Sequence, residues 1–364
     1  MMRKLAMYTT ASFLLFFLAA TRAYGQGDAR PRVAIGHVPE GSSMVDAKMG
    51  ADGVIHLLFQ KDGAPFYATS TDGGATARSA IPVIKAKINP PGLEFLGWDM
   101  AVSEKGKVFV VMGNNGWKFK LPADQQGMFL ATLEPGAKEF APMTHLVELP
   151  SEGFSIVAGK GPSVTAAYLR GKLYWKHSTD DGKTFSPDSE INKDYLPCSC
   201  CTTSLVVGRD GTLAVLYREA TDNRRDIYAV LSKDGKESRV RISQTLWEIN
   251  ACPMTYFRIM PAGDGFVAAW PTRGEVYFAR FSSTGKLWEP GEIKVGGKTA
   301  MRSSVFALAG ANDTTLVAWK SDDKLHWRIF DATGKPIGQE AESPGPGSQA
   351  GGVVDKQGGY VLFP

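Results

Sequence analysis

The sequence lacks the motifs that mark several common classes of enzyme. It has no phosphate-binding or dinucleotide-binding glycine motif and no G-x-S-x-G elbow, so nucleotide-dependent chemistry and Ser/His/Asp hydrolysis have no local support. Its five histidines are scattered along the chain. After Gly25, no apolar run is long enough to cross a bilayer and no stretch has a clear helical apolar period. With 40 Gly and 21 Pro, the composition argues against a helical bundle.

The chain also has little excess charge of either sign. It carries 41 Lys and Arg against 37 Asp and Glu, a formal net charge of +4. Arg3, Lys4 and Arg22 lie within positions 1–25, which contain no acid, so the remainder is close to neutral. A nucleic-acid binder needs a basic stripe, and we therefore expect no nucleic-acid partner.

The N-terminal segment, from Met1 to Gly25, has the pattern of a secretory signal. A basic start precedes the apolar run Ala11–Ala20, and Ala23 and Gly25 place small residues at the −3 and −1 positions of a cleavage site. A membrane anchor would need about 20 apolar residues, twice the length of this run. We expect a signal peptide at 1–25, a mature domain at 26–364, export to the periplasm or the extracellular space, and no membrane insertion after cleavage.

The rest of the chain repeats a hairpin pattern. Two apolar runs joined by a Gly, Asp or Asn turn recur at a nearly constant spacing, with turns centred on Gly53, Gly106, Gly161, Gly211, Gly265, Asp313 and Gly358. A second hairpin follows most of them. Two hairpins per period make a four-stranded blade, and radial repetition of blades predicts an all-β, single-domain β-propeller.

The number of blades depends on the two chain ends. Six modules have both hairpins, whereas the last unit, Gln349–Phe363, has only one, and Arg32–Val38 is an unpaired strand pattern. If these two ends pair, they form a seventh blade that closes the ring. We favour seven blades; six is the alternative, if the last hairpin merely caps the ring.

The turns between the strands carry a family resemblance. Residues Ser178–Phe185, STDDGKTF, fit the Asp-box pattern S-x-D-x-G-x-T-[FW], and Ser70–Thr76 fits all of it except the aromatic. The chain therefore resembles the sialidase-like (BNR-repeat, Asp-box) β-propellers, of the exported bacterial type. In that pattern Ser and Asp bond local amides and Gly adopts an unusual dihedral. The resemblance implies an architecture and does not assign an activity.

The catalytic residues of sialidases are not carried over by this resemblance. Those enzymes use an arginine triad, a Tyr nucleophile with a Glu partner, and an Asp acid/base, and their first arginine lies in [FY]-R-I-P before the first Asp box. Phe257-Arg258-Ile259-Met260 is similar but lies in the fifth module. A glycosidase needs two carboxyl groups, or a Tyr with a carboxylate. The candidates are Asp99, Glu219, Asp226 and Tyr217, with Glu248 as a further carboxylate.

Arginines and aromatic residues are expected to line the central funnel. In a propeller, the starts of the inner strands and the ends of the second strands share one face, which is the usual ligand face. Five arginines and two tryptophans map there: Arg218, Arg224, Arg225, Arg273, Arg302, Trp98 and Trp270. Guanidinium groups grip carboxylates in two places, so an anionic glycan is the expected ligand. Alternatively, some arginines pair with Glu219, Asp222 and Asp226 on solvated loops.

All four cysteines lie at the starts of modules four and five. Cys198, Cys200 and Cys201 occur in PCSCCTT and Cys252 in NACPMT. An exported protein with an even number of cysteines usually oxidises them. We expect Cys252 to be bonded to one member of the 198–201 cluster.

A soft-metal site is the alternative function for the same residues. Thiolates together with Met254 suit Cu(I) or a similar ion, whereas the spacing lacks the double C-x2-C form of a zinc site. The sequence thus favours an exported monomeric propeller, without a required cofactor, that binds and could hydrolyse an anionic glycan. The alternative is a non-catalytic propeller that binds a soft metal or a protein partner through its Cys/Met rim.

Overall fold

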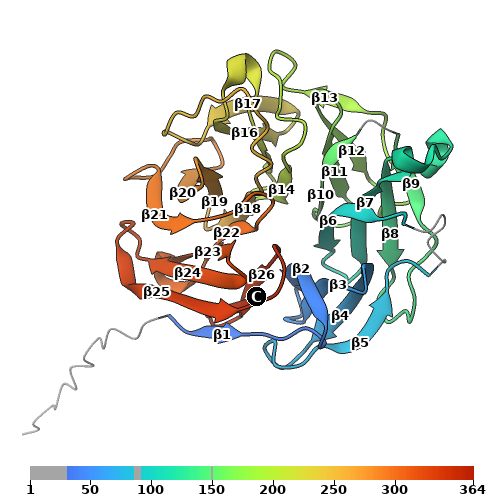
Figure 1. The fold of residues 1–364 in the computed structure, drawn as a ribbon, viewed down its shortest axis with the longest axis horizontal. Helices are drawn as coiled ribbons and strands as arrows, with labels where there is room; N and C mark the ends of the chain where they lie inside the picture. Colours follow the sequence, from blue (N-terminus) through green and yellow to red (C-terminus); the bar gives the residue numbers. More distant parts are fainter. Residues whose placement is uncertain (1–30, 86–91, 149–150) are drawn as a thin grey trace, which may run out of the picture. The chain divides into compact units, whose positions relative to one another are not determined.

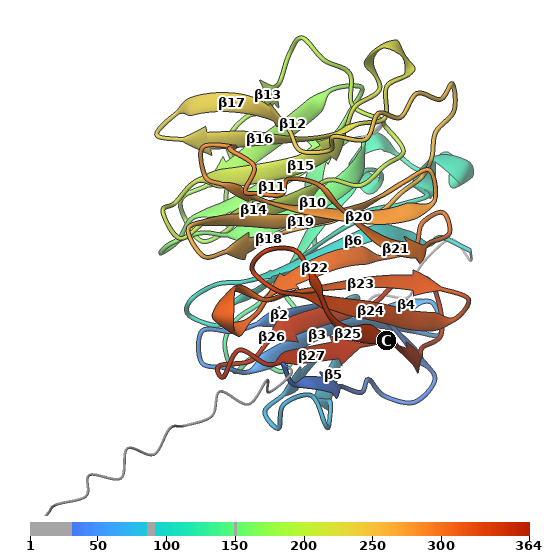
Figure 2. The ribbon, with the colours of Figure 1, turned by 90° about the vertical axis from the view of Figure 1, so that its left-hand side faces the viewer.

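We analysed a computed structural model of the chain, which describes residues 31–85, 92–148 and 151–364. The predicted leader at 1–25 lies outside these residues. The described part forms seven sheets arranged around one axis (Figure 1). Figure 2, turned by 90°, shows the strands of successive sheets lying one above the next. The all-β, seven-bladed propeller predicted from the hairpin period is confirmed.

Six blades are four-stranded antiparallel meanders that run outward from the axis, and the seventh is a three-stranded sheet. The inner strands are β2 (Ser42–Met49), β6 (Phe95–Val102), β10 (Glu152–Ala158), β14 (Ser204–Val207), β18 (Arg258–Ala262), β22 (Val305–Ala309) and β26 (Gly351–Val354). The second strands are β3 (Ile55–Lys61), β7 (Val108–Asn114), β11 (Val164–Leu169), β15 (Leu213–Arg218), β19 (Gly265–Thr272), β23 (Thr315–Ser321) and β27 (Tyr360–Phe363).

In six blades two outer strands complete the sheet. The third strands are β4 (Ala64–Ser70), β8 (Met128–Leu133), β12 (Leu173–Ser178), β16 (Ile227–Lys233), β20 (Glu275–Ser282) and β24 (Lys324–Phe330). The fourth strands are β5 (Arg78–Pro82), β9 (Thr144–Val147), β13 (Ser189–Ile191), β17 (Lys236–Arg241), β21 (Ile293–Lys298) and β25 (Pro336–Pro344). Four short 3-10 helices lie in described loops: η1 (Gly116–Phe119), η2 (Ala123–Gln125), η3 (Thr221–Asn223) and η4 (Ala311–Asp313). No helix among the described residues has the length and apolar character that a membrane crossing requires.

The seventh blade is built from both ends of the chain, as predicted. Strand β1 (Val33–Ile35) pairs in parallel with β27, with Val33 opposite Tyr360, and gives the three-stranded order β1-β27-β26. Figure 1 shows blue β1 beside the red C-terminal strands. Beyond β1, the Gly36 N–H donates to the Leu362 carbonyl at 2.7 Å. The N-terminal strand therefore joins the ring ends as a hydrogen-bonded clasp.

The core lies between the blades. Seven apolar clusters of described residues each combine the faces of two neighbouring sheets, including one between the first and seventh blades. In that cluster Phe59 and Phe363 are about 1% exposed. Flat sheets with alternating side chains can bury both faces only when another blade lies on each side. The packing therefore requires a closed ring.

The turn at Ser178–Phe185 has the local hydrogen bonds that its sequence pattern predicts. The Gly182 N–H donates to Ser178 Oγ at 2.9 Å, and the Thr184 N–H and hydroxyl donate to the two carboxylate oxygens of Asp180. These bonds hold the pKa of Asp180 well below its usual range. Gly182 has φ of 78° and lies against the ring of Phe109 in the neighbouring blade. The turn therefore stabilises blade packing.

Phe363 tests whether ring closure contributes to stability. We expect Phe363→Ala to lower the free energy of unfolding by about 3–5 kcal/mol, the usual cost of truncating a buried Phe. Leu246→Ala is the matched control, because Leu246 is 57% exposed, and it should change stability by less than about 0.5 kcal/mol. Urea denaturation of both variants measures the difference. Equal losses would show that the closing blade does not hold the ring.

Candidate functional site

A cavity of about 830 Å³ opens at the centre of the ring. Its wall includes residues of the inner strands or the segments just before them, from every blade. The wall includes Lys48, Trp98, Asp99, Trp117, Ser151, Glu152, Cys200, Cys201, Thr202, Tyr256, Arg258 and Arg302. The cavity therefore lies where the propeller pattern placed the ligand face.

Four charged side chains form a network at the cavity wall. Arg258 donates from Nη1 to Asp46 Oδ1 and from Nη2 to the Val45 carbonyl, at 3.3 Å for the second bond. Lys48 Nζ lies 3.1 Å from Asp46 Oδ2 and 3.9 Å from Asp99 Oδ1. Because Asp46 and Lys48 belong to β2, Asp99 to β6 and Arg258 to β18, the network connects three blades across the axis. We call these four residues the axial charge network.

The two carboxyl groups of the axial charge network differ in acidity. Burial alone would raise the pKa of Asp46, but the charges of Arg258 and Lys48 outweigh it and hold that pKa below its ordinary value. Burial raises the pKa of Asp99 to about 6, and the charge of Asp46 adds to this rise while Lys48 opposes it. One carboxylate thus stays ionised as a structural anion, and the other is set to exchange a proton near neutral pH.

One side of the cavity wall carries an arginine beside two further titratable groups. Arg302 is exposed and lines the cavity, and its guanidinium forms no ion pair within the described ranges of the chain. Partial burial raises the pKa of Glu152, and Arg302 opposes this. Burial likewise raises the pKa of Tyr256, with Arg302 again opposing. Arg302 is therefore a cation directed at the cavity without a carboxylate bound to it.

The predicted arginines do not converge on the cavity; of the five, only Arg302 lines it. Arg218 and Arg225 are buried, and both donate to backbone carbonyl oxygens inside the protein. Arg224 and Arg273 are exposed on loops outside the cavity wall, and Arg273 donates to a backbone carbonyl at 2.9 Å. The expectation failed for the other four because these arginines, at the ends of second strands or in the loops after them, turn into the blade or outward rather than toward the axis.

The two tryptophans also separate. Trp98 lies in the cavity wall. Trp270 is fully buried in the apolar cluster between the fourth and fifth blades, where it has no access to a ligand.

The candidate catalytic residues are divided in the same way. Asp99 lines the cavity, whereas Tyr217, Glu219 and Asp226 are buried outside its wall. Arg239 donates to the Tyr217 hydroxyl at 2.7 Å and pairs with Glu219. Asp226 pairs with Arg241 at 3.1 Å. Because β17 supplies both arginines, these three side chains belong to a polar network within the fourth blade.

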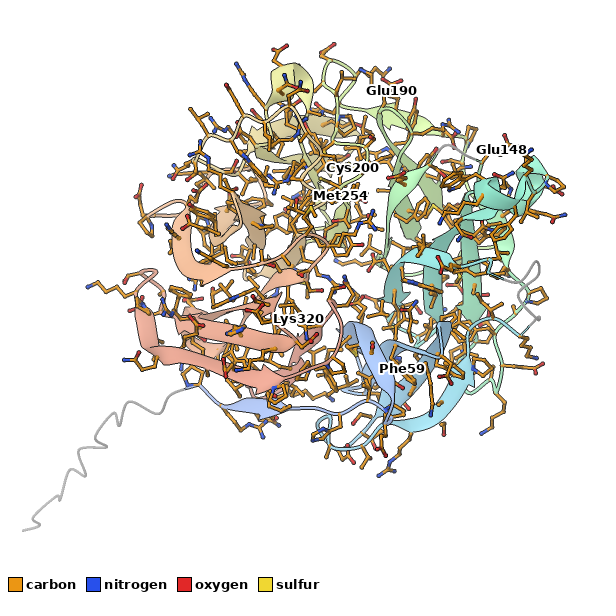
Figure 3. The ribbon with its side chains drawn as sticks, viewed as in Figure 1. Phe59, Glu148, Glu190, Cys200, Met254 and Lys320 are labelled. Atoms are coloured by element: carbon orange, nitrogen blue, oxygen red, sulfur yellow. A yellow bond between two sulfur atoms is a disulfide. The ribbon has the colours of Figure 1, made fainter. Side chains whose placement is uncertain are left out.

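The cysteines come together, as expected from their equivalent positions in neighbouring blades. Cys200 and Cys252 form a disulfide with a Cα–Cα distance of 6.6 Å, which links the fourth and fifth blades. Cys198 and Cys201 are buried thiols beside it. The sulfur atoms of Cys198, Cys200 and Cys252 lie within 4.8 Å of one another, so they could hold a soft ion together only with the disulfide reduced. The Met254 carbonyl accepts the Arg302 N–H at 2.7 Å (Figure 3 labels Met254 and Cys200).

Sequence reasoning missed three of the four residues in the axial charge network. Arg258 lies in Phe257-Arg258-Ile259-Met260, whose place in the fifth module argues against the sialidase role, and no motif singles out Asp46 or Lys48. A usable signal was present, since a charged residue inside the apolar inner strand of a propeller must find a partner near the axis.

Comparisons with known proteins show a common fold. No protein-family model and no curated protein matches the chain. A solved structure described as NanB plus Optactamide aligns with a TM-score of 0.51 and 10% identity, over 80% of this chain and 67% of that one. The Hadza microbial sialidase Hz136 aligns with a TM-score of 0.48 and 11% identity, over 83% of this chain and 66% of that one. This chain thus spans just under two thirds of that sialidase.

A lectin is also among the solved structures that align with the chain. A mutant of the Aleuria aurantia lectin AAL, in complex with Fucalpha1-6GlcNAc, aligns with a TM-score of 0.49 and 15% identity, over 84% of this chain and 97% of that one. At 10% identity, the alignment with the NanB structure shows the fold alone.

The raised pKa of Asp99 predicts a pH-dependent effect on stability. Its pKa rises from 3.8 to about 6 on folding, so its contribution to stability is complete below pH 4 and is lost as the pH rises through 6. An amide does not ionise, and Asp99→Asn should therefore be more stable than the wild type at pH 8, by up to about 3 kcal/mol, and equal to it at pH 4.

Denaturation of both proteins at the two pH values measures this difference. The exposed Asp313→Asn, on the η4 loop, is the control and should show no such dependence. A stability difference for Asp99→Asn that does not change with pH would contradict the assigned protonation.

Proposed function

We propose that this protein binds an anionic glycan in its central cavity. The observation that carries the proposal is Arg302, a cavity-facing cation without a carboxylate partner among the described residues, in a cavity that Trp98 and Trp117 also line. A guanidinium group in such a position binds a carboxylate or sulfate through charge-assisted hydrogen bonds. The cavity of about 830 Å³ has room for more than one sugar ring.

The rest of the wall supports a polyhydroxylated ligand. Trp98 is partly exposed and Trp117 is 60% exposed, and such rings stack on the apolar faces of sugars. Ser151 Oγ and Thr202 Oγ1 are buried at the wall and have no hydrogen-bond partner within the described ranges. Neither oxygen is accessible to a ligand in this conformation, so contact with a sugar rests on the two tryptophans.

In the catalytic form of the proposal, the bound glycan is hydrolysed and Asp99 acts as the acid. A carboxyl group with a pKa of about 6 can donate a proton to a leaving oxygen near neutral pH. Glycoside hydrolysis needs a second carboxyl group, and Glu152 is the exposed carboxylate in the same wall. Asp46 cannot take this role because it is fully buried and paired.

Arginine substitutions test the binding proposal. Arg302→Ala should weaken the binding of N-acetylneuraminic acid or glucuronic acid by about tenfold or more, because a charged hydrogen bond contributes about 1.5–3 kcal/mol. Arg273→Ala is the matched control, since Arg273 is also exposed but lies outside the cavity, and it should bind as the wild type does. Isothermal titration calorimetry, with glucose as the neutral ligand, measures both.

Two results would contradict this proposal. The first is that no anionic sugar binds the wild type more tightly than glucose does. The second is that the two arginine variants lose affinity equally.

An aryl glycoside of the sugar that binds best tests the catalytic form. Asp99 must be protonated to act as the acid, so kcat/KM should fall about tenfold for each pH unit above 6. Asp99→Asn should lose most of the activity, whereas Asp313→Asn should retain it. Binding without turnover by the wild type would leave the protein a lectin and remove the role of Asp99.

A further inference from the structure

The cysteine cluster is the strongest chemical feature that the proposed function does not use. Its members come from the segment before β14 and the segment before β18. Cys200 and Cys201 line the central cavity, and Cys200 is partly exposed. Cys198 and Cys201 are at most 4% exposed. The cluster thus combines a disulfide at the cavity wall with a dithiol directly behind it.

Cys198 lies in contact with all three other sulfur atoms. Its Sγ is 3.0 Å from Cys201 Sγ, 3.6 Å from Cys252 Sγ and 3.9 Å from Cys200 Sγ. Thiol–disulfide exchange requires a thiolate to reach a disulfide sulfur directly. Cys198 and Cys201 also form a C-x-x-C pair, the spacing in which one thiol commonly becomes a thiolate.

Arg218 supplies a positive charge behind the dithiol. It is 1% exposed and donates to three neutral oxygens, those of Thr255 Oγ1 and the Arg225 and Pro271 carbonyl groups, and no salt bridge joins it to a described carboxylate. Thr255 Oγ1 also lies 3.8 Å from Cys201 Sγ. A buried cation without a counter-charge is costly, and a thiolate at Cys201 would provide one.

One hydrogen bond joins the two thiols, with Cys201 Sγ as the donor and Cys198 Sγ as the acceptor at 3.0 Å. When the dithiol has lost one proton, the remaining proton can pass between the two sulfur atoms along this bond.

We propose that the four cysteines form a thiol–disulfide exchange site whose substrate is a low-molecular-weight thiol in the central cavity. The substrate thiolate attacks Cys200 Sγ, the Cys200–Cys252 bond breaks, and Cys252 leaves as a thiolate. A second substrate thiolate then attacks the substrate sulfur of the mixed disulfide and releases Cys200. Two thiols are thereby oxidised to one disulfide, and the protein disulfide is reduced by the same two electrons.

The dithiol of Cys198 and Cys201 allows the protein disulfide to move from one cysteine pair to another without an external thiol. Cys201 takes the proton of Cys198, and the Cys198 thiolate attacks Cys252, which forms Cys198–Cys252 and releases Cys200 as a thiolate. Cys201 then passes its proton through solvent to Cys200 and attacks Cys198, which forms Cys198–Cys201 and releases the Cys252 thiolate. The number of disulfides and the total charge stay constant. The site does not depend on glycan binding.

Trapping experiments test this proposal with glutathione as the thiol. The full-length mature protein is equilibrated in glutathione buffers of graded redox ratio and quenched with N-ethylmaleimide. Tandem mass spectrometry of non-reduced peptides then gives the pairings. We expect Cys198–Cys252 and Cys198–Cys201 to appear in the wild type beside Cys200–Cys252. In Cys201→Ser, Cys198–Cys252 should still form.

A rate comparison separates the role of Cys198 from a structural one. In Cys198→Ser, glutathione should still exchange with Cys200. The disulfide of this variant should stay at Cys200–Cys252. After glutathione has reduced it, that disulfide should re-form at least tenfold more slowly than in the wild type. Cys198→Ala gives the same readout if the serine variant does not fold.

Three results would overturn the proposal. One is a wild type that holds only Cys200–Cys252 in every buffer, with Cys198 and Cys201 alkylated throughout. Another is a disulfide that only a protein reductant, and not glutathione, can open. The third is a protein isolated with one soft metal ion bound to the thiolates of Cys198, Cys200 and Cys252, as elemental analysis would show.

Discussion

The buried ion pair between Asp46 and Arg258 is the interaction on which the centre of this propeller depends. The two residues are 212 positions apart and lie on inner strands of the first and fifth blades. Asp46 is fully buried, and removal of one partner from such a pair commonly costs about 3–5 kcal/mol. The pair therefore fixes two opposite parts of the ring relative to each other. It also directs Lys48 toward Asp99, whose acidity then depends on both charges.

Apolar packing holds neighbouring blades together, whereas the axial charge network connects inner strands across the axis. The seven clusters between blades make rigid walls, and the space that the inner strands enclose is lined by apolar side chains together with polar and charged ones. The disulfide between Cys200 and Cys252 adds a covalent link at the same inner edge. A preorganised cavity of this kind binds a ligand without ordering its own side chains first, which preserves affinity.

The sequence predicted the architecture well because the architecture is a repetition. The period of the hairpin pattern sets the number of blades, and the unpaired patterns at Arg32–Val38 and Gln349–Phe363 identified the closing blade. The same period placed the 198–201 cysteine cluster and Cys252 at neighbouring inner edges, and the structure pairs Cys252 with Cys200. Asp99, Trp98 and Arg302 were assigned to the ligand face for the same reason, and the structure has them in the cavity wall.

The rest of the site could not be read from the period. The period gives the position of a residue along a blade but does not say whether the side chain turns toward the axis. Arg218 and Tyr217, for example, turn into the core of the blade. The hairpin period also shows which blades are neighbours but not which residues of distant blades meet at the axis. It therefore could not predict the pairing of Asp46 with Arg258.

The most direct test of the account is a crystal structure of the protein with an anionic sugar, such as N-acetylneuraminic acid, soaked into it. We predict that the sugar lies in the central cavity, with its carboxylate bound by the Arg302 guanidinium and its ring against Trp98. A sugar bound elsewhere, or a carboxylate that avoids Arg302 at saturating ligand, would contradict the account.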